Sequence, residues 1–178
     1  METQKINSKI ASQLITICLT ITFSLISGLS CSQNVVDFSG KWVLNKSKSS
    51  TLFAEVSSTY IITQTNNTIN IEITQLKKDT KPVISSEKYV IGSSMEGKSG
   101  SKNIIVEVAW SSDKQAFSIT EVTSYSENGT TKESKRIKTY SLTDAGKTMI
   151  IKTDNIPPSG SKTADSDKNT VMVFNKSI

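Results

Sequence analysis

The chain has 178 residues, of which 35% are hydrophobic and 6% aromatic, and its formal net charge is +5. It contains no histidine, which removes the commonest general base and the commonest metal ligand. Its lysines are spread among acidic residues, whereas a nucleic-acid surface needs clustered Lys and Arg with aromatic side chains for stacking, so nucleic acid is not an expected partner.

The N-terminal stretch is typical of an export signal. Residues 1–9 are polar and carry two lysines, residues 10–29 are uncharged and rich in Ile, Leu and Thr, and small residues then lead to Cys31. A basic start, an apolar segment and a small-residue end are the parts of a signal peptide. The apolar segment is also long enough for a transmembrane helix, but its Ser and Thr content and its small-residue end favour cleavage. We therefore predict a signal peptide over residues 1–31 and a folded domain over residues 32–178.

Cys31 has two possible fates at the end of this signal. The string Gly28-Leu29-Ser30-Cys31 resembles a bacterial lipobox, in which cleavage before the cysteine exposes it for lipid attachment. Several acyl chains anchor a domain stably, so this outcome, which we favour, gives a cell-envelope lipoprotein at the outer membrane or the periplasmic face. In the alternative, Ser30-Cys31-Ser32 is a small-x-small cleavage site, Cys31 is discarded and the domain is periplasmic or secreted. The other cysteine, Cys18, lies within the signal, so no intramolecular disulfide is expected.

The rest of the chain is a series of short apolar runs separated by turn residues. Residues 68–74 give the clearest strand, because three isoleucines alternate strictly with polar residues, and residues 104–110 alternate in the same way. Asn66-Asn67 and Asn128-Gly129 favour hairpin turns, since Asn and Gly tolerate the left-handed backbone that tight hairpins need. Further strands are expected over residues 40–45, 58–65, 85–91, 117–121, 131–142, 148–153 and 170–174.

Three segments are expected to lack strands: residues 46–56 as a loop with a short helical turn, residues 92–102 as a mobile connection, and residues 155–168 as a loop. A series of short strands with frequent turns and no long helix indicates an all-β protein. Sequential hairpins favour an antiparallel up-and-down meander that closes into a β-barrel of about 8–9 strands and leaves no exposed edge. A barrel of this size is either filled by side chains or holds one small ligand.

A short motif at the head of the first predicted strand points to a family. The string Phe38-Ser39-Gly40-Lys41-Trp42 carries a G-x-W motif and resembles the opening of lipocalin-like proteins exported by bacteria. Asp144-Ala145-Gly146-Lys147 is similar to a D-G-K-x-L turn late in those domains, and Ser112-Asp113-Lys114 is similar to an earlier turn. The resemblance covers about residues 35–178. It implies a lipocalin-like barrel, with the last strand paired to the first, that binds a small hydrophobic molecule.

Three aromatic residues are candidates for lining or closing that barrel: Trp42, Trp110 and Tyr140. Each of them either contacts a ligand or fills the core, and the position of Trp42 near the chain start favours closure of one barrel end. Lys176, after the last predicted strand, is placed to cover Trp42. If these aromatic residues and their apolar neighbours fill the interior, the ligand hypothesis fails, whereas an open cavity of several hundred Å³ supports it.

The sequence contains no motif for catalysis or for metal binding. Most acidic residues lie at predicted turns, where Asp accepts backbone hydrogen bonds, and no serine lies in a nucleophile elbow. We therefore predict a monomeric protein that is not an enzyme and has no cofactor or metal. It binds a small hydrophobic or amphipathic molecule and meets the membrane through a lipid on Cys31. The alternative is a filled barrel that acts as a structural or interaction module of the cell envelope.

Overall fold

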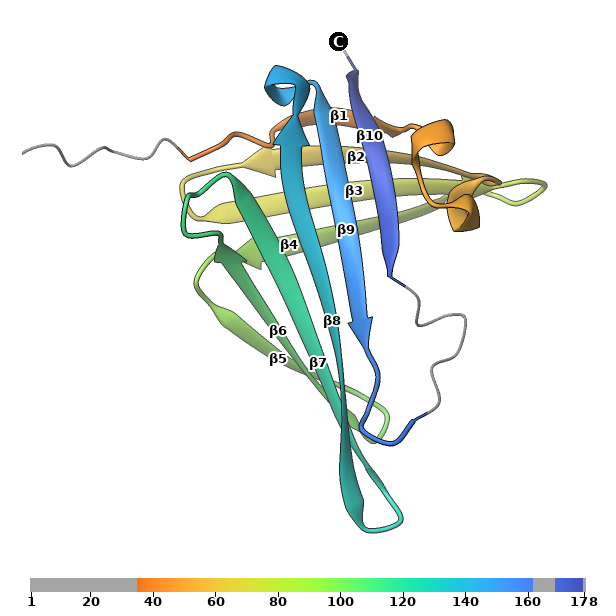
Figure 1. The fold of residues 1–178 in the computed structure, drawn as a ribbon, viewed down its shortest axis with the longest axis vertical. Helices are drawn as coiled ribbons and strands as arrows, with labels where there is room; N and C mark the ends of the chain where they lie inside the picture. Colours follow the sequence, from red (N-terminus) through yellow and green to blue (C-terminus); the bar gives the residue numbers. More distant parts are fainter. Residues whose placement is uncertain (1–34, 162–168, 178) are drawn as a thin grey trace, which may run out of the picture. The chain divides into compact units, whose positions relative to one another are not determined.

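The computed structural model describes residues 35–161 and 169–177, which form one antiparallel sheet of ten strands (Figure 1). The strands lie in the order β4-β3-β2-β1-β10-β9-β8-β7-β6-β5. They are β1 (Gly40–Leu44), β2 (Val56–Gln64), β3 (Thr68–Lys77), β4 (Val83–Val90), β5 (Ser94–Ser99), β6 (Lys102–Trp110), β7 (Ala116–Glu127), β8 (Thr130–Thr143), β9 (Thr148–Ile156) and β10 (Thr170–Ser177). Three short 3-10 helices lie between strands: η1 (Lys46–Lys48), η2 (Thr51–Phe53) and η3 (Asp144–Gly146).

This topology confirms the predicted all-β antiparallel meander. The predicted return of the last strand to the first is also confirmed, because Trp42 of β1 pairs with Lys176 of β10 and Leu44 pairs with Phe174. The expected helical turn after the first strand is present as η1 and η2. Asn45 caps η1, with its side-chain oxygen accepting from the Lys48 backbone N–H at 3.3 Å.

The strand count and the closure differ from the prediction. The segment expected to be a mobile connection contains β5, in which Met95 pairs with Val106 and Gly97 with Ile104 of β6. All six residues of β5 are exposed, so it has no alternation of buried and exposed positions that a sequence pattern could reveal. The order of the sheet begins at β4 and ends at β5, and no ladder joins these two strands within the described residues. The barrel is therefore open along one seam.

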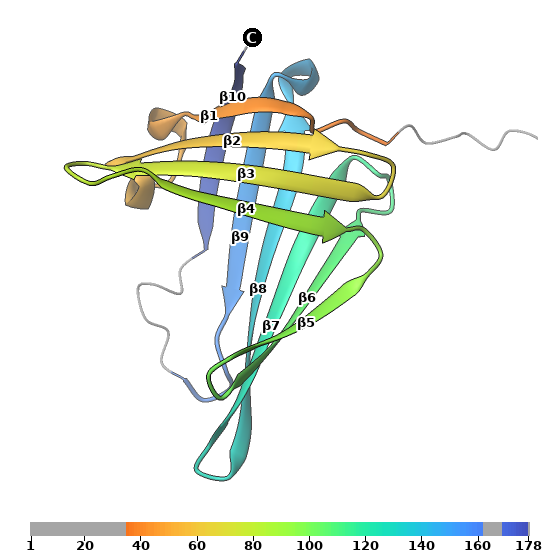
Figure 2. The same cartoon turned by 180° about the vertical axis from the view of Figure 1, so that it is seen from behind.

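The sheet bends over itself. In both views β1 to β4 run across the direction of β6 to β9, and the two groups of strands face each other (Figure 1, Figure 2). Side chains from the two groups meet between them, since one buried cluster contains both Ile71 of β3 and Phe117 of β7. We call the surface that the two groups enclose the inner face.

Alternation along the strands builds the core on this inner face. Residues i and i+2 of a strand point to the same side, so the isoleucines that predicted β3 are all buried. Strands β2 and β9 repeat the pattern, whereas β10 has three consecutive buried residues, Met172, Val173 and Phe174. The buried apolar cluster is Phe38, Trp42, Leu44, Tyr60, Ile62, Ile69, Ile71, Ile73, Val108, Phe117, Ile119, Tyr140, Met149, Ile151, Met172 and Phe174.

The G-x-W motif has a physical basis in the closure between β1 and β10. Trp42 is completely buried, and its indole Nε1 donates a hydrogen bond to the Phe38 carbonyl at 2.9 Å. Lys176 lies over the indole with its Nζ 5.2 Å from the ring centroid, as the sequence suggested. Gly40 has φ +140°, and a Cβ at this position would lie 2.8 Å from the Cε of Lys176. Glycine is favoured here by its backbone conformation, and it lets the lysine cover the tryptophan without shifting.

The two predicted hairpin turns have different backbones. At Asn128-Gly129 both residues have positive φ, 51° and 74°, as a tight turn of the predicted kind requires. The Asn66-Asn67 hairpin is present as predicted, but neither asparagine is among the residues with positive φ. Thr65 instead donates its backbone N–H to the Thr68 carbonyl at 2.9 Å, and this bond closes a turn that needs no left-handed residue.

Replacing Gly40 with alanine tests the packing of Lys176 against Trp42. We expect Gly40→Ala to lower the free energy of unfolding by about 2 kcal/mol or more, because a Cβ adds backbone strain and displaces the lysine. Urea denaturation measures the change. Gly97→Ala is the control, since a Cβ there meets nothing within 4 Å. In a Gly40→Ala, Lys176→Ala double variant the loss should be smaller than the sum of the single losses, and simple additivity would contradict the proposed contact.

Ser58 is expected to reduce stability. It is buried on β2, and its Oγ is a buried side-chain atom with no hydrogen-bond partner among the described residues. We expect Ser58→Ala to raise the free energy of unfolding by about 1 kcal/mol, because it removes an unsatisfied polar group. Thr148→Val is the matched control and should destabilise, because the Thr148 hydroxyl donates to Asp144 Oδ2 at 2.6 Å. Destabilisation by both substitutions would show that the Ser58 hydroxyl has a partner in solution.

Candidate functional site

One end of the inner face is filled by aromatic rings. Phe117 stacks on Tyr140 with ring centroids 4.4 Å apart and meets Phe38 edge-on at 4.9 Å. Trp110 packs against Phe117 at 5.8 Å and against Phe38 at 6.2 Å. Such contacts leave no room for a ligand among these rings. A filled interior is the result that we expected to exclude a ligand, and at this end of the domain the interior is filled.

The residues singled out from the sequence belong mostly to this filled end. Trp42 and Tyr140 are completely buried in the cluster, and Trp110 is half-buried at its border. Trp110 and Tyr140 are brought together through Phe117, while Trp42 lies at the closure between β1 and β10. Cys31, the predicted site of lipid attachment, lies outside the described residues.

The other end of the inner face is hollow. A cavity of about 530 Å³ lies over the far halves of β6, β7 and β8 and the segment that follows β9. Its lining includes Ile104 from β6, Glu121 and Tyr125 from β7, Arg136 from β8 and Asn155 from β9. These residues share the inner face with the core, because Glu121 pairs with Arg136 and Arg136 with Asn155 in the ladder, as Phe117 pairs with Tyr140. A volume of this size is within the range of small-molecule sites.

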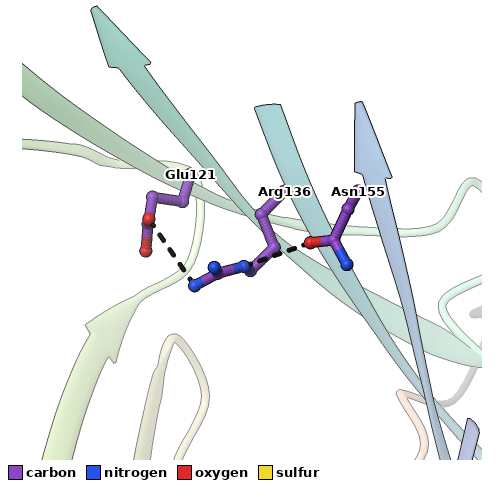
Figure 3. Close-up of polar contacts among 3 residues, drawn as sticks. All are labelled: Glu121, Arg136 and Asn155. Carbon is purple, nitrogen blue, oxygen red and sulfur yellow. Dashed lines mark hydrogen bonds and ion pairs between the residues drawn. The ribbon is translucent and has the colours of Figure 1, made fainter. Parts of the chain in front are cut away.

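Arg136 lines this cavity and contacts residues on the two flanking strands (Figure 3). Its Nη1 lies 3.8 Å from Glu121 Oε1, and its Nε donates to Asn155 Oδ1 at 3.3 Å. The Arg136 side chain is 52% exposed and that of Glu121 is 38% exposed, so solvent reaches both groups. A guanidinium has five N–H donors, and the contacts with these two residues engage a minority of them. The remaining donors can bind a planar anion such as a carboxylate.

The charge of the cavity is positive. Lys102 and Arg136 lie on the inner face with one acid, Glu121, and Lys135 also lines the cavity although it alternates to the outer side of the sheet. Lys102 is placed over the ring of Tyr125, with Nζ 5.4 Å from the centroid. Exposed ion pairs contribute little to stability, so the pair between Arg136 and Glu121 is weak evidence for a structural role. The excess of positive charge favours a ligand with an anionic group.

Three tyrosines of the inner face, Tyr60, Tyr89 and Tyr140, have raised pKa values. Burial raises the pKa of Tyr60 to about 12, and the Glu87 carboxylate adds to the effect. Burial and Glu87 also raise the pKa of Tyr89, whose hydroxyl donates to Glu87 Oε2 at 2.9 Å. Burial raises the pKa of Tyr140 well above its ordinary value. In the described part of the chain no three Cys, Asp or Glu side chains are grouped to hold a metal ion.

Sequence reasoning placed the site at the aromatic residues and did not select Arg136. One signal could have pointed to it: Arg136 is the only arginine in a chain otherwise supplied with lysine. It also lies four residues before Tyr140 on the same strand, so alternation puts both on one face. The partners of Arg136 could not be read from the sequence, because Glu121 and Asn155 meet it only through the strand register.

Comparison with known proteins places the fold. Protein-family models give no match to this chain, and curated protein sequences give none either. Among solved structures, human cRBP IV aligns with a TM-score of 0.50 at 12% identity, over 80% of this chain and 99% of that one. A REP1-NXSQ fatty acid transporter aligns with a TM-score of 0.49 at 11% identity, over 80% and 97% of the two chains. The fluorescent protein UnaG gives 0.47 at 11% identity, over 79% and 97%. The alignment with cRBP IV shows a shared fold.

The raised tyrosine pKa values predict a loss of stability in alkali. Because Tyr60 ionises near pH 12 in the folded protein and near pH 10 in a solvated chain, its contribution to stability is complete below pH 10. That contribution falls as the pH rises from about 10 to 12. We expect the melting temperature to fall across this range, and to fall less steeply in Tyr60→Phe. Tyrosinate absorbance measured in parallel should rise with unfolding. A rise well below pH 10 that leaves the fold intact would contradict the burial.

Proposed function

We propose that this protein binds a small amphipathic anion in the hollow end of its barrel. The observation that carries the proposal is the placement of Arg136, which is fixed from both sides, open to solvent and surrounded by an excess of positive charge. A guanidinium with free donors in such a setting receives a carboxylate, sulfate or phosphate group. The shared fold is one in which small barrels enclose single ligands, and it supports the proposal by analogy only.

The apolar part of the ligand has a surface available beside the charged group. Ile104, Val106 and Val108 lie on the inner face of β6, and their burial increases toward the core. If the anionic group of the ligand binds Arg136 on β8, a hydrocarbon portion that lies along β6 would cover Ile104 and Val106. Both side chains are half-buried when no ligand is bound. Ser85 on β4 and Met95 on β5 point to the same interior and are exposed, so the open seam provides a route of entry.

A barrel without a ligand is the second candidate, and the filled end favours it. In that case the interior serves only to bury the aromatic cluster that stabilises the fold, and the cavity is an ordinary solvated surface. Native mass spectrometry of the purified protein separates the two functions, because a binding protein retains a small molecule of defined mass. Neither candidate function is catalytic.

The proposal includes export to the cell envelope. It rests on the signal-like sequence of residues 1–31, with Cys31 either lipid-modified or removed. Mass spectrometry of the mature N-terminus distinguishes an acylated Cys31 from a chain that begins at Gln33. The helices described are too short to span a membrane.

Removing the charge of Arg136 tests the proposed role. We expect Arg136→Gln to weaken binding of a long-chain carboxylate about 10- to 100-fold, the usual loss for a hydrogen bond to a charged group. Binding of the alcohol of equal chain length should change less than about twofold. Displacement of a fluorescent amphipathic probe gives both affinities. Glu121→Gln should strengthen carboxylate binding, because it removes the competing anion.

Lys41→Gln is the matched control for this experiment, because it removes an exposed positive charge on β1 away from the cavity. It should leave both affinities unchanged. Equal weakening of the carboxylate and the alcohol by Arg136→Gln would show that the substitution damages the barrel. If no variant distinguishes the two ligands, Arg136 is not the anion site.

A further inference from the structure

One end of the domain combines exposed aliphatic side chains with a concentration of lysines. It consists of η1, η2 and the turn between β3 and β4, which Figure 1 shows on the same side of the domain. A groove of about 500 Å³ joins these elements, with a lining from Lys46 and Glu55 on one side and residues 76–80 on the other. We call this region the basic tip.

Four aliphatic side chains of the basic tip are exposed to an unusual degree. Ile84 is 75% exposed, Leu52 72%, Val83 65% and Leu76 42%. Ile84 and Leu76 lie on the outer side of the sheet, because they follow the alternation opposite to the buried isoleucines of β3. Val83 pairs with Gln75 and so lies on the opposite side of the sheet from Ile84, at the same end of the domain. A single exposed leucine needs no explanation, but exposed aliphatic side chains concentrated at one end of the domain mark an interaction surface.

Lysines surround these aliphatic side chains. Lys46 and Lys48 belong to η1, and Lys77, Lys78 and Lys81 lie along the β3–β4 turn, all of them exposed. The acidic residues of the same region are Glu55 and Asp79. The basic tip therefore carries an excess of three positive charges beside its aliphatic side chains.

We propose that the basic tip docks the domain on an anionic lipid surface. Aliphatic side chains that enter the interface together with lysines at the headgroups are the combination that peripheral membrane proteins use. A protein partner is less suited to this surface. Protein interfaces are anchored by Trp, Tyr and Arg, and the exposed residues named for the basic tip include none of them. Lysine, a hydrated point charge, suits a diffuse layer of phosphate groups.

The experiment must separate docking by the basic tip from attachment by the N-terminal segment. In the full chain with Cys18 and Cys31 changed to serine, an environment-sensitive fluorophore is placed on Leu52→Cys in one sample and on Ile156→Cys in another. Ile156 is also exposed but lies at the end of β9 outside the tip. Both labelled chains have the same N-terminus, so only docking of the tip distinguishes their probes. Vesicles of phosphatidylcholine with and without phosphatidylglycerol are then added.

We expect a blue shift at Leu52→Cys with the anionic vesicles alone, and no shift at Ile156→Cys. Changing Lys77, Lys78 and Lys81 to Gln should lower the vesicle affinity of the tip probe on the order of 100-fold, since each lysine near an anionic surface contributes about fivefold. The control changes three exposed lysines elsewhere, Lys41, Lys88 and Lys98, and should lower it far less.

Two outcomes would overturn the proposal. Equal shifts at both labels would show that the chain is held by its N-terminal segment, and the absence of a shift at Leu52→Cys would show that the tip does not enter the lipid. Circular dichroism of each variant confirms that the fold is intact. The carboxylate affinity measured without vesicles is independent of this result, so failure here leaves the role of Arg136 unaffected.

Discussion

The ladder between β1 and β10 is the constraint on which the rest of the domain depends. It joins the first strand of the sheet to the last, and it turns two meanders, β1 to β4 and β5 to β10, into one continuous sheet. Each meander alone would expose one apolar face to water. Trp42 occupies the point of closure, with Phe38 accepting its indole hydrogen bond and Lys176 covering its ring. The inner face exists as an enclosed surface because these contacts hold.

Along the strands, the side chains of the inner face change from aromatic to charged, while inward-facing and outward-facing residues continue to alternate. On β8, Tyr140 is buried in the aromatic cluster, and Arg136, four residues away on the same face, is half-exposed in the cavity. Four residues of a strand span roughly 13 Å, about the length of a small amphipathic molecule. The domain thus obtains its stability at one end and its free volume at the other. Neither use interferes with the packing of the other.

The architecture could be predicted from the sequence wherever a buried face alternates with an exposed one. The isoleucines of β3 were readable for this reason. The Asn-Gly turn was readable because its residues tolerate a left-handed backbone, and the return of the last strand followed from the resemblance to lipocalin-like proteins. Strand β5 was missed because it is exposed on both faces and depends on its ladder with β6. The partners of Arg136 and the groove between η1 and the β3–β4 turn were also hidden. Both depend on contacts between segments far apart in the chain.

The unpaired seam between β4 and β5 gives this barrel a mechanical property that a closed barrel lacks. Where the two strands leave their connecting turn, the Gly92 backbone N–H donates to the Val108 carbonyl at 2.8 Å. Farther along, no described ladder bond crosses the seam. Widening a closed barrel breaks backbone hydrogen bonds at roughly 1 kcal/mol each, whereas here the two half-sheets can bend apart beyond the Gly92 bond without breaking a ladder bond between β4 and β5. The size of a bound ligand is therefore limited by how far the twisted sheet can bend, and not by the fixed diameter of a closed barrel.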